Sequence, residues 1–271
     1  MECYERGILT KEDTDGLELT FGNAQALVEM VERIALRKGL GDILAEGTKR
    51  ASEKIGKGSS EYAIHVKGEE LPMHEPRYRQ GMGLHYSVNA SGPDHCSGIQ
   101  DDVVIKKFPK GEGINMDGTL SGTEMSPRKA RLLYDVGLWR HVANYIGMCI
   151  FLPWSNQQIC DAVEGVTGWP MSFRNLMRVA ERGIALARIF NLREGFSRSD
   201  DTLPRRFFTS PPEGPLSNIF IDRDMLGTAQ QAYFQMLGWN EAGIPTHEKL
   251  VDLDMEWADE HIPSRSLQGD H

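Results

Sequence analysis

Apolar residues recur at helical spacing along most of the chain. The first run follows Asn23, a residue that caps helices well, and a second extends from Ile43 to Ile55 and stops at Gly56. Four further runs begin at residues typical of helix N-termini, namely Ser126, Ser155, Ser172 and Asp222. Only residues 62–66 alternate as a short strand does. The pattern therefore predicts a mainly α-helical fold.

Two long segments lack this periodicity. Residues 67–122 are rich in glycine and proline and contain His74, His85 and His95, whereas residues 191–218 contain four prolines and predict an extended connection. A long irregular stretch inside a compact domain is typically functional. We therefore expect the chemistry of this chain in residues 67–122.

The N-terminus has the pattern of a helix end. Residues 1–6 are compatible with a helix and Gly7 is a typical terminating residue, but six residues cannot nucleate a helix alone. A frayed start is one interpretation. The other is that the helix begins upstream, so that the chain is part of a larger protein.

Composition excludes several classes of protein. The 271 residues carry a net charge of −9, opposite to that of a nucleic-acid binder. The longest apolar run, residues 145–154, is half the length of a membrane span, and the first thirty residues lack a signal peptide. Four scattered cysteines cannot form a disulfide framework. We expect a cytoplasmic protein with no membrane span and no nucleic-acid partner.

The histidines of the irregular segment are the first candidates for chemistry. Their spacing, together with His65, matches no compact zinc pattern, and His65 and His85 are interpreted as half-buried or surface side chains. His95 ends the turn Ser91–Gly92–Pro93–Asp94–His95, where the Asp94 carboxylate is placed to hold the imidazole in one tautomer. A turn histidine exposed to water fits the same spacing.

A glycine-rich stretch around residue 80 supplies a second candidate. Glu75 precedes Pro76–Arg77 and then Gly81–Met82–Gly83–Leu84, which lacks the lysine and serine of a phosphate-binding loop. The stretch is also compatible with a plain crossing between helices, with Glu75 a solvated carboxylate. Its place in this loop makes Glu75 a candidate for proton transfer.

Cys149 differs in context from the other cysteines. None of the four lies in a C-x-x-C pair, and Cys3 and Cys160 fall on apolar helical positions. Cys149 follows Asn144-Tyr145-Ile146-Gly147-Met148, in which Gly147 permits a close backbone approach and Asn144 offers both hydrogen-bond donors and acceptors. Spacing alone leaves a buried core thiol open.

Seven stretches taken together resemble the C-terminal half of the aldehyde ferredoxin oxidoreductase family. In chain order they are MECYERGILT, ILAEGTKRAS, VKGEELPMHEPR with GMGLHY, GPDH, NYIGMC, NLREGFSRSDDTLPRR and YFQMLGWNEAGIPTHEKL. The resemblance implies a mainly α fold in which residues 1–66 are the remainder of the helical middle domain. Residues 67–271 would form the C-terminal helical domain with the active-site loops, and we expect no counterpart of the family's N-terminal β domain in these residues.

The resemblance also implies roles for individual residues. The family's D-x-x-G-x-C motif falls on Asn144, Gly147 and Cys149, so Asn144 and the backbone of residues 146–148 (Ile146, Gly147 and Met148) would bind the pterin and Cys149 would ligate the iron–sulfur cluster. The family's R-G-x-x-H turn falls on Ser91, Gly92 and His95 and would place His95 near the metal as a proton donor or acceptor. Glu75 stays the second catalytic candidate because of its place in the glycine-rich loop, not because of the resemblance. The sequence departs from the family pattern at two positions. Asn144 replaces an aspartate, which weakens the hydrogen bond to the pterin. Ser91 replaces an arginine, which weakens the binding of an anionic group near His95.

The complete family enzyme implied by the resemblance oxidises aldehydes to carboxylic acids. Its cofactors are a tungsten (or molybdenum) bis-pterin and a 4Fe-4S cluster, its substrate is a small aldehyde, and its electron acceptor is ferredoxin. The three-cysteine run and the first pterin motif of the family precede Met1, so we expect the isolated chain to be inactive. The alternative is a non-catalytic helical interaction module, or one half of a split enzyme that binds a separate N-terminal subunit.

Overall fold

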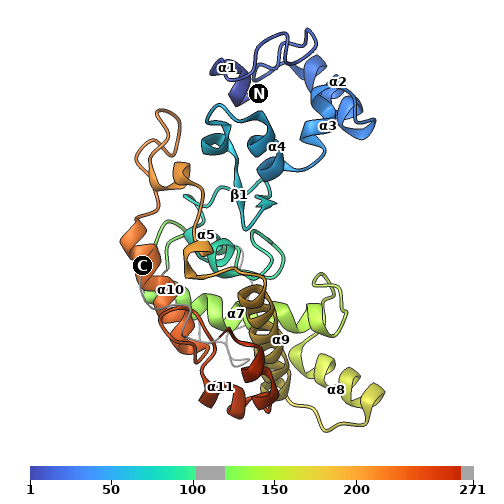
Figure 1. Cartoon of the computed structure of the whole chain (residues 1–271). Coiled ribbons are helices and arrows are strands. Elements are labelled where there is room, and N and C mark those ends of the chain that lie inside the picture. Colours follow the sequence, from blue (N-terminus) through green and yellow to red (C-terminus); the bar gives the residue numbers. More distant parts are fainter. Residues whose placement is uncertain (102–119, 264–271) are drawn as a thin grey trace.

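The computed structural model describes residues 1–101 and 120–263, and this part of the chain is mainly helical (Figure 1). The N-terminal part contains α1 (Glu2–Glu5), α2 (Ala24–Ala35), α3 (Leu40–Leu44), α4 (Thr48–Ile55) and the 3-10 helix η1 (Ser59–Tyr62). The strands β1 (His65–Val66) and β2 (Glu69–Glu70) pair antiparallel, His65 with Glu70 and Val66 with Glu69. This hairpin lies between the N-terminal helices and the rest of the fold.

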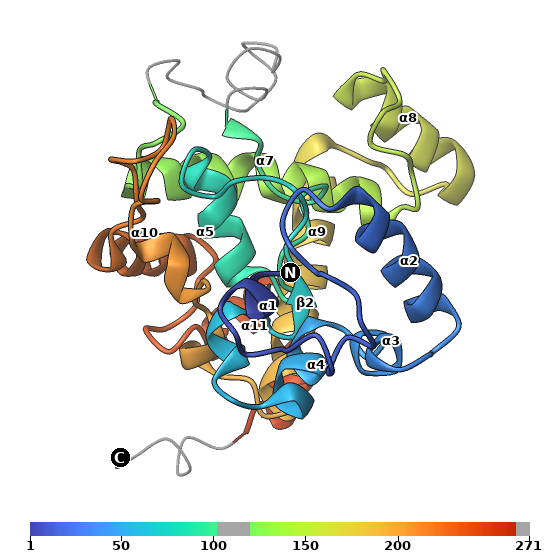
Figure 2. The same ribbon diagram turned by 90° about the horizontal axis from the view of Figure 1, so that it is seen from above.

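The larger part of the fold surrounds a buried helix. This helix, α5 (Gln80–Val88), contacts α7 (Pro127–Tyr145) and α10 (Arg223–Met236), while α9 (Phe173–Arg193) packs against α7. The peripheral elements are α8 (Asn156–Thr167), η2 (Arg198–Asp200), η3 (Arg205–Phe208), α11 (His247–Asp252) and η4 (Glu256–His261). Viewed from above, α2 and α8 project from the same side of the molecule (Figure 2). None of the helices in the described ranges is long and apolar enough to cross a membrane.

The predicted helix starts are confirmed by their capping hydrogen bonds. Asn23 accepts a bond from the Ala26 amide, and Ser126 accepts one from the Lys129 amide. The capping box of Ser155 and Gln158 is present. The N-caps Ser172 and Asp222 likewise accept bonds from the first turns of α9 and α10.

Three local predictions are wrong. The helix expected over residues 43–55 is split into α3 and α4, because Gly47 adopts φ +88°, outside the helical region. The strand expected over residues 62–66 is reduced to His65–Val66, because η1 extends to Tyr62. The glycine-rich crossing is instead the helix α5, and all nine of its residues are buried.

The glycines of α5 explain how a helix fits there. A Cβ added to Gly81 would lie 2.4 Å from Ile99 Cδ1 and 2.7 Å from Asp101 Oδ1. Asp101 in turn accepts hydrogen bonds from the amides of Gly81 and Met82 and pairs with the buried Lys129. The glycines therefore permit close packing around the start of α5, at the cost of their low helix propensity.

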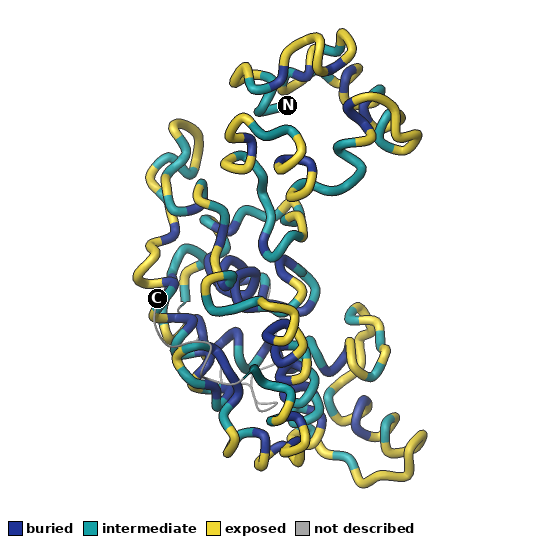
Figure 3. The backbone as a smooth tube through the Cα atoms, in the orientation of Figure 1, coloured by how far each residue is buried: buried dark blue, intermediate teal, exposed yellow. Residues whose placement is uncertain are grey.

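Apolar residues form one large core and smaller ones. The large core joins α5, α7, α9 and α10, whereas a small cluster around Leu9, Leu19 and Met30 stabilises the N-terminal part (Figure 3). An ion pair between Glu2 and Arg206 connects the two parts. These cores are compatible with a domain boundary at residue 66, which stays a prediction.

Candidate functional site

The C-terminal end of α7 positions the residues of the predicted cofactor motif. Gly147 adopts φ +71°, its amide donates to the Asn144 carbonyl, and the Met148 amide donates to the Ala143 carbonyl. These two bonds form a Schellman motif, which ends the helix and turns the chain sharply. The glycine is therefore needed to end the helix, and the turn sets Cys149 beyond it.

The residues around this turn line two different cavities. Asn144 is exposed and lines a polar cavity, whereas residues 146–149 line an apolar groove on the other side of the helix end. The side chains of Ile146 and Met148 pack against the core, but Cys149 is an exposed free cysteine. The buried core thiol that spacing left open is therefore excluded.

The polar cavity has a volume of about 360 Å³ and lies between α5, α7, α9 and the loop after α5. Apolar side chains such as Ile184, Phe190 and Trp239 form much of its wall, and the polar side chains that line it include Asn89, Ser91, Asp94, Asn144, Arg188 and Asn191. Two histidines complete it: His85 Nε2 lies 3.2 Å from Ser97 Oγ, and His141 Nδ1 is buried with no hydrogen-bond partner in the described chain. A ligand with hydrogen-bonding groups at its edges suits this lining.

The two histidines are held neutral. Burial lowers the pKa of His85 to about 3, with a smaller contribution from His141, and burial lowers the pKa of His141 to about 4. The surface or half-buried position expected for His85 is wrong, since it is only 3% exposed on the inner helix α5. His141 was not predicted from the sequence, although it lies three residues before Asn144 on the same helix face.

Acid is expected to destabilise the fold through this pair. Unfolded histidine has a pKa of about 6.5, so below that pH the unfolded chain binds two protons that the folded chain does not. Stability should fall as the pH falls towards the folded pKa values, by about 2 kcal/mol per histidine between pH 7 and pH 5. Urea unfolding at both pH values measures this loss. His141→Asn should halve it, and an unchanged loss in that variant would contradict the assignment.

Tyr145 fixes the end of α7 against α9. Its ring lies over Gly183, where an added Cβ would be 2.2 Å from the ring carbon Cζ. The ring also contacts His141, with 5.8 Å between the ring centroids. A side chain at Gly183 would therefore displace Tyr145 and, with it, the turn that carries Asn144 and Cys149.

Two alanine substitutions in long helices test this packing. Gly227→Ala, in α10, meets no atom within 4 Å and should stabilise the helix by up to about 1 kcal/mol. Gly183→Ala raises the helix propensity equally, but its added Cβ would collide with the Tyr145 ring. Overpacking of this kind typically costs about 1–3 kcal/mol. We expect Gly183→Ala to be the less stable variant in urea unfolding. Equal stabilisation of both variants would show that Tyr145 moves aside freely.

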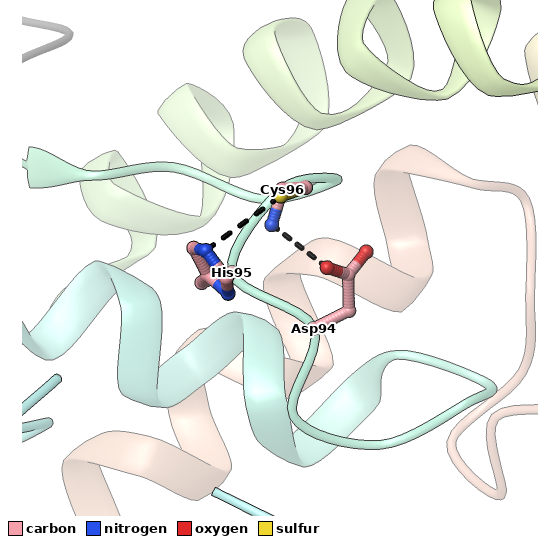
Figure 4. A group of neighbouring side chains, drawn as sticks. All are labelled: Asp94, His95 and Cys96. Carbon is pink, nitrogen blue, oxygen red and sulfur yellow. Dashed lines mark hydrogen bonds between the residues drawn. The ribbon is translucent and has the colours of Figure 1, made fainter. Parts of the chain in front are cut away.

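The structure brings the two predicted catalytic segments together. The His74 and His95 rings lie 5.0 Å apart, so the segment of Glu75 contacts the turn of His95. The Asp94 carboxylate accepts bonds from the Cys96 and Ser97 amides, while His95 Nε2 lies 3.7 Å from Cys96 Sγ (Figure 4). Asp94 therefore stabilises the turn itself, a role that the sequence did not indicate.

Glu75 is held as a carboxylate. Its oxygens accept bonds from the Arg77 amide and guanidinium at 2.8–2.9 Å. Burial raises the pKa of Glu75, but these hydrogen bonds and the Arg77 charge outweigh it, so the pKa lies below its usual value. In this arrangement Glu75 suits proton acceptance more than proton donation.

The apolar groove beside Cys149 has a volume of about 920 Å³. The ends of α7, α8 and α9 line it, with Leu152, Trp154, Val166 and Trp169 among the exposed side chains. In the described residues, the one cluster of three potential metal-ligating side chains does not include Cys149. A cluster bound at Cys149 therefore needs its other ligands from elsewhere.

Comparison with known proteins identifies the family. Residues 1–255 match the profile described as aldehyde ferredoxin oxidoreductase, domains 2 & 3. The tungsten-containing aldehyde ferredoxin oxidoreductase of Pyrococcus horikoshii is 33% identical over 94% of this chain and 41% of its own length. The WOR-like subunit of aliphatic sulfonate oxidoreductase from Pyrococcus furiosus is 30% identical over 93% of this chain and 38% of its own.

A solved structure shares the fold. The active-site complex BamBC of benzoyl coenzyme A reductase, solved with 1,5-dienoyl-CoA, matches all of this chain and 44% of its own with a TM-score of 0.69 and 23% identity. The chain spans about two-fifths of the length of the curated relatives it matches. The mainly helical fold expected from the resemblance is confirmed. On the strength of the match between residues 1–255 and the profile of domains 2 & 3, the chain belongs to the aldehyde ferredoxin oxidoreductase family.

Proposed function

We propose that this chain forms one wall of the cofactor site of a tungsten-pterin, iron–sulfur oxidoreductase that oxidises aldehydes to carboxylic acids. The observation that carries the proposal is the placement of Asn144 and Cys149 around one helix end, with the amide in the polar cavity and the thiol exposed in the apolar groove on the other side of that end. The names of the tungsten-containing relatives support the choice of cofactor. Ferredoxin is the electron acceptor that follows from those names.

The residues of the chain fit such a cofactor. Asn144 and the unpartnered His141 Nδ1 would offer hydrogen bonds to the edge of a pterin, and the exposed Cys149 thiol would ligate iron. When bound, the tungsten-pterin supplies the oxidation chemistry and the cluster carries electrons away. His95 would move a proton at its ring nitrogen, and Glu75, kept ionised by Arg77, would be the second proton acceptor.

A polypeptide that supplies the remaining ligands would cover exposed apolar surface of this chain. Leu27, Val28 and Val31 are more than half exposed on α2, and Trp154 and Trp169 are exposed beside the groove of Cys149. Patches of this kind typically mark interaction sites. We propose that they bind the N-terminal portion of a family member, in the reducing cytoplasm, which is compatible with four free cysteines.

Anaerobic co-production tests the proposal. The chain is produced with the N-terminal three-fifths of the Pyrococcus horikoshii relative, the part that this chain does not match, and tungsten and pterin are measured in the purified complex. Stoichiometric tungsten supports the proposed function. A stable complex without tungsten or pterin would instead favour the non-catalytic interaction module, and no complex at all would contradict both.

Asn144 offers a graded test in the same complex. Asn144→Asp turns a neutral hydrogen bond to the pterin amine into a charge-assisted one, which is roughly twice as strong, so pterin should dissociate about fivefold more slowly. Asn144→Ala removes the bond and should release pterin faster than the parent. Pterin release, followed by fluorescence after dilution, measures both. Equal rates in the three proteins would place the pterin away from Asn144.

A further inference from the structure

The turn after α5 brings three kinds of metal-ligating side chain together. A carboxylate oxygen of Asp94, a ring nitrogen of His95 and the sulfur of Cys96 all lie within 4.8 Å of one another. Cys96 lies between the other two side chains, and its sulfur is 3.7 Å from His95 Nε2 (Figure 4). All three residues are half-buried, so a small ion can reach them.

The spacing of sulfur and nitrogen matches that around a tetrahedral ion. Zinc binds thiolate at about 2.3 Å and imidazole at about 2.0 Å, which places the two ligand atoms about 3.6 Å apart. The observed 3.7 Å therefore needs almost no rearrangement. Carboxylate, imidazole and thiolate are all ligands that zinc accepts, and thiolate disfavours magnesium and calcium.

The turn is held in this geometry before any ion binds. Asp94 accepts hydrogen bonds from the Cys96 amide at 2.8 Å and from the Ser97 amide at 3.1 Å, and each carboxylate oxygen keeps a lone pair. His74 packs against the ring of His95 from a different segment, with 5.0 Å between centroids. His74 does not belong to the group of mutually close ligand atoms, so water would fill the fourth position, as in zinc sites with three protein ligands.

From these observations we infer that Asp94, His95 and Cys96 bind a borderline-soft divalent ion such as zinc, with water as the fourth ligand. Binding requires the deprotonated thiol, so the Cys96 proton is released to solvent as the ion enters. The site uses only residues of this chain and does not depend on the proposed oxidoreductase function. An ion there would occupy His95 Nε2 and so compete with proton transfer by His95.

Cobalt titration of the purified full chain tests the inference. After treatment with a chelator, Co²⁺ is added without oxygen and the thiolate-to-cobalt charge-transfer absorption is followed. We expect one ion per chain, displaced by zinc. Cys96→Ser should abolish the charge-transfer band, whereas His74→Ala, which removes a neighbouring imidazole outside the cluster, should keep it.

Two further variants keep the outcome unambiguous. Cys149→Ser, which removes the exposed thiol, should keep the band, whereas His95→Ala should weaken binding with the Cys96 thiol intact. Absence of a band in the parent, or its loss in Cys149→Ser with retention in Cys96→Ser, would overturn the inference. Because the chain is tested without pterin or cluster, a missing band leaves the proposed function to its own experiment, whereas a bound ion would oppose only the proton transfer proposed for His95.

Discussion

Cys149→Ser is expected to remove most of the iron from the complex with the N-terminal portion of a relative. Serine offers a hydroxyl in place of the thiolate that iron–sulfur clusters require. Because the Cys149 side chain is exposed, the substitution leaves the core intact and stability should be nearly unchanged. Iron per complex, measured by mass spectrometry after anaerobic purification, gives the result directly.

Cys160→Ser is the matched control. Its thiol is buried in the large core on α8, so serine there introduces a buried hydroxyl and should lower stability by about 1–3 kcal/mol. Iron should nevertheless remain at the parent level. If Cys149→Ser retained its iron while Cys160→Ser lost it, the cluster would lie elsewhere.

Asp201→Asn is expected to be the most destabilising of the substitutions proposed. Asp201 accepts two hydrogen bonds from Arg188, at 3.0 and 2.9 Å, and lies 3.0 Å from Lys67 Nζ. All three side chains are at most 2% exposed. Removing the single negative charge leaves two buried cations without a counterion, which typically costs about 3–5 kcal/mol.

An exposed ion pair provides the comparison. Glu61 lies 3.4 Å from Arg205 Nη1, and both side chains are more than half exposed. Glu61→Gln should therefore change the free energy of urea unfolding by less than about 1 kcal/mol. A cost for Asp201→Asn as small as that of Glu61→Gln would show that water reaches the buried group.

The helix starts were predictable because their signals are local. Asn23, Ser126 and Ser155 each accept a hydrogen bond from the amide three residues ahead, and that bond requires nothing from the rest of the fold. α5 was not predictable in this way. Ile99 and Asp101, which are distant in sequence, fill the space that Gly81 leaves. From the sequence alone the glycine therefore predicts a break in the helix, and only the packing of these side chains explains it.

The residues of the candidate site were likewise predictable only where a sequence motif marks them. The family's D-x-x-G-x-C motif pointed to Asn144 and Cys149. The structure explains the glycine between them, because Gly147 ends α7. The roles of these residues, and those of His95 and Glu75, stay predictions. His141 carries no sequence signal, because only the packing of α7 against α5 and α9 buries its ring in the polar cavity.

The most direct test of the account is the position of the iron relative to Cys149. An anomalous difference map at the iron edge, from crystals of the complex with the N-terminal portion of a relative, locates the cluster without assumptions about its ligands. The account predicts an iron atom at bonding distance from Cys149 Sγ. A cluster whose four ligands all come from the other polypeptide, with the Cys149 thiol facing solvent, would contradict it.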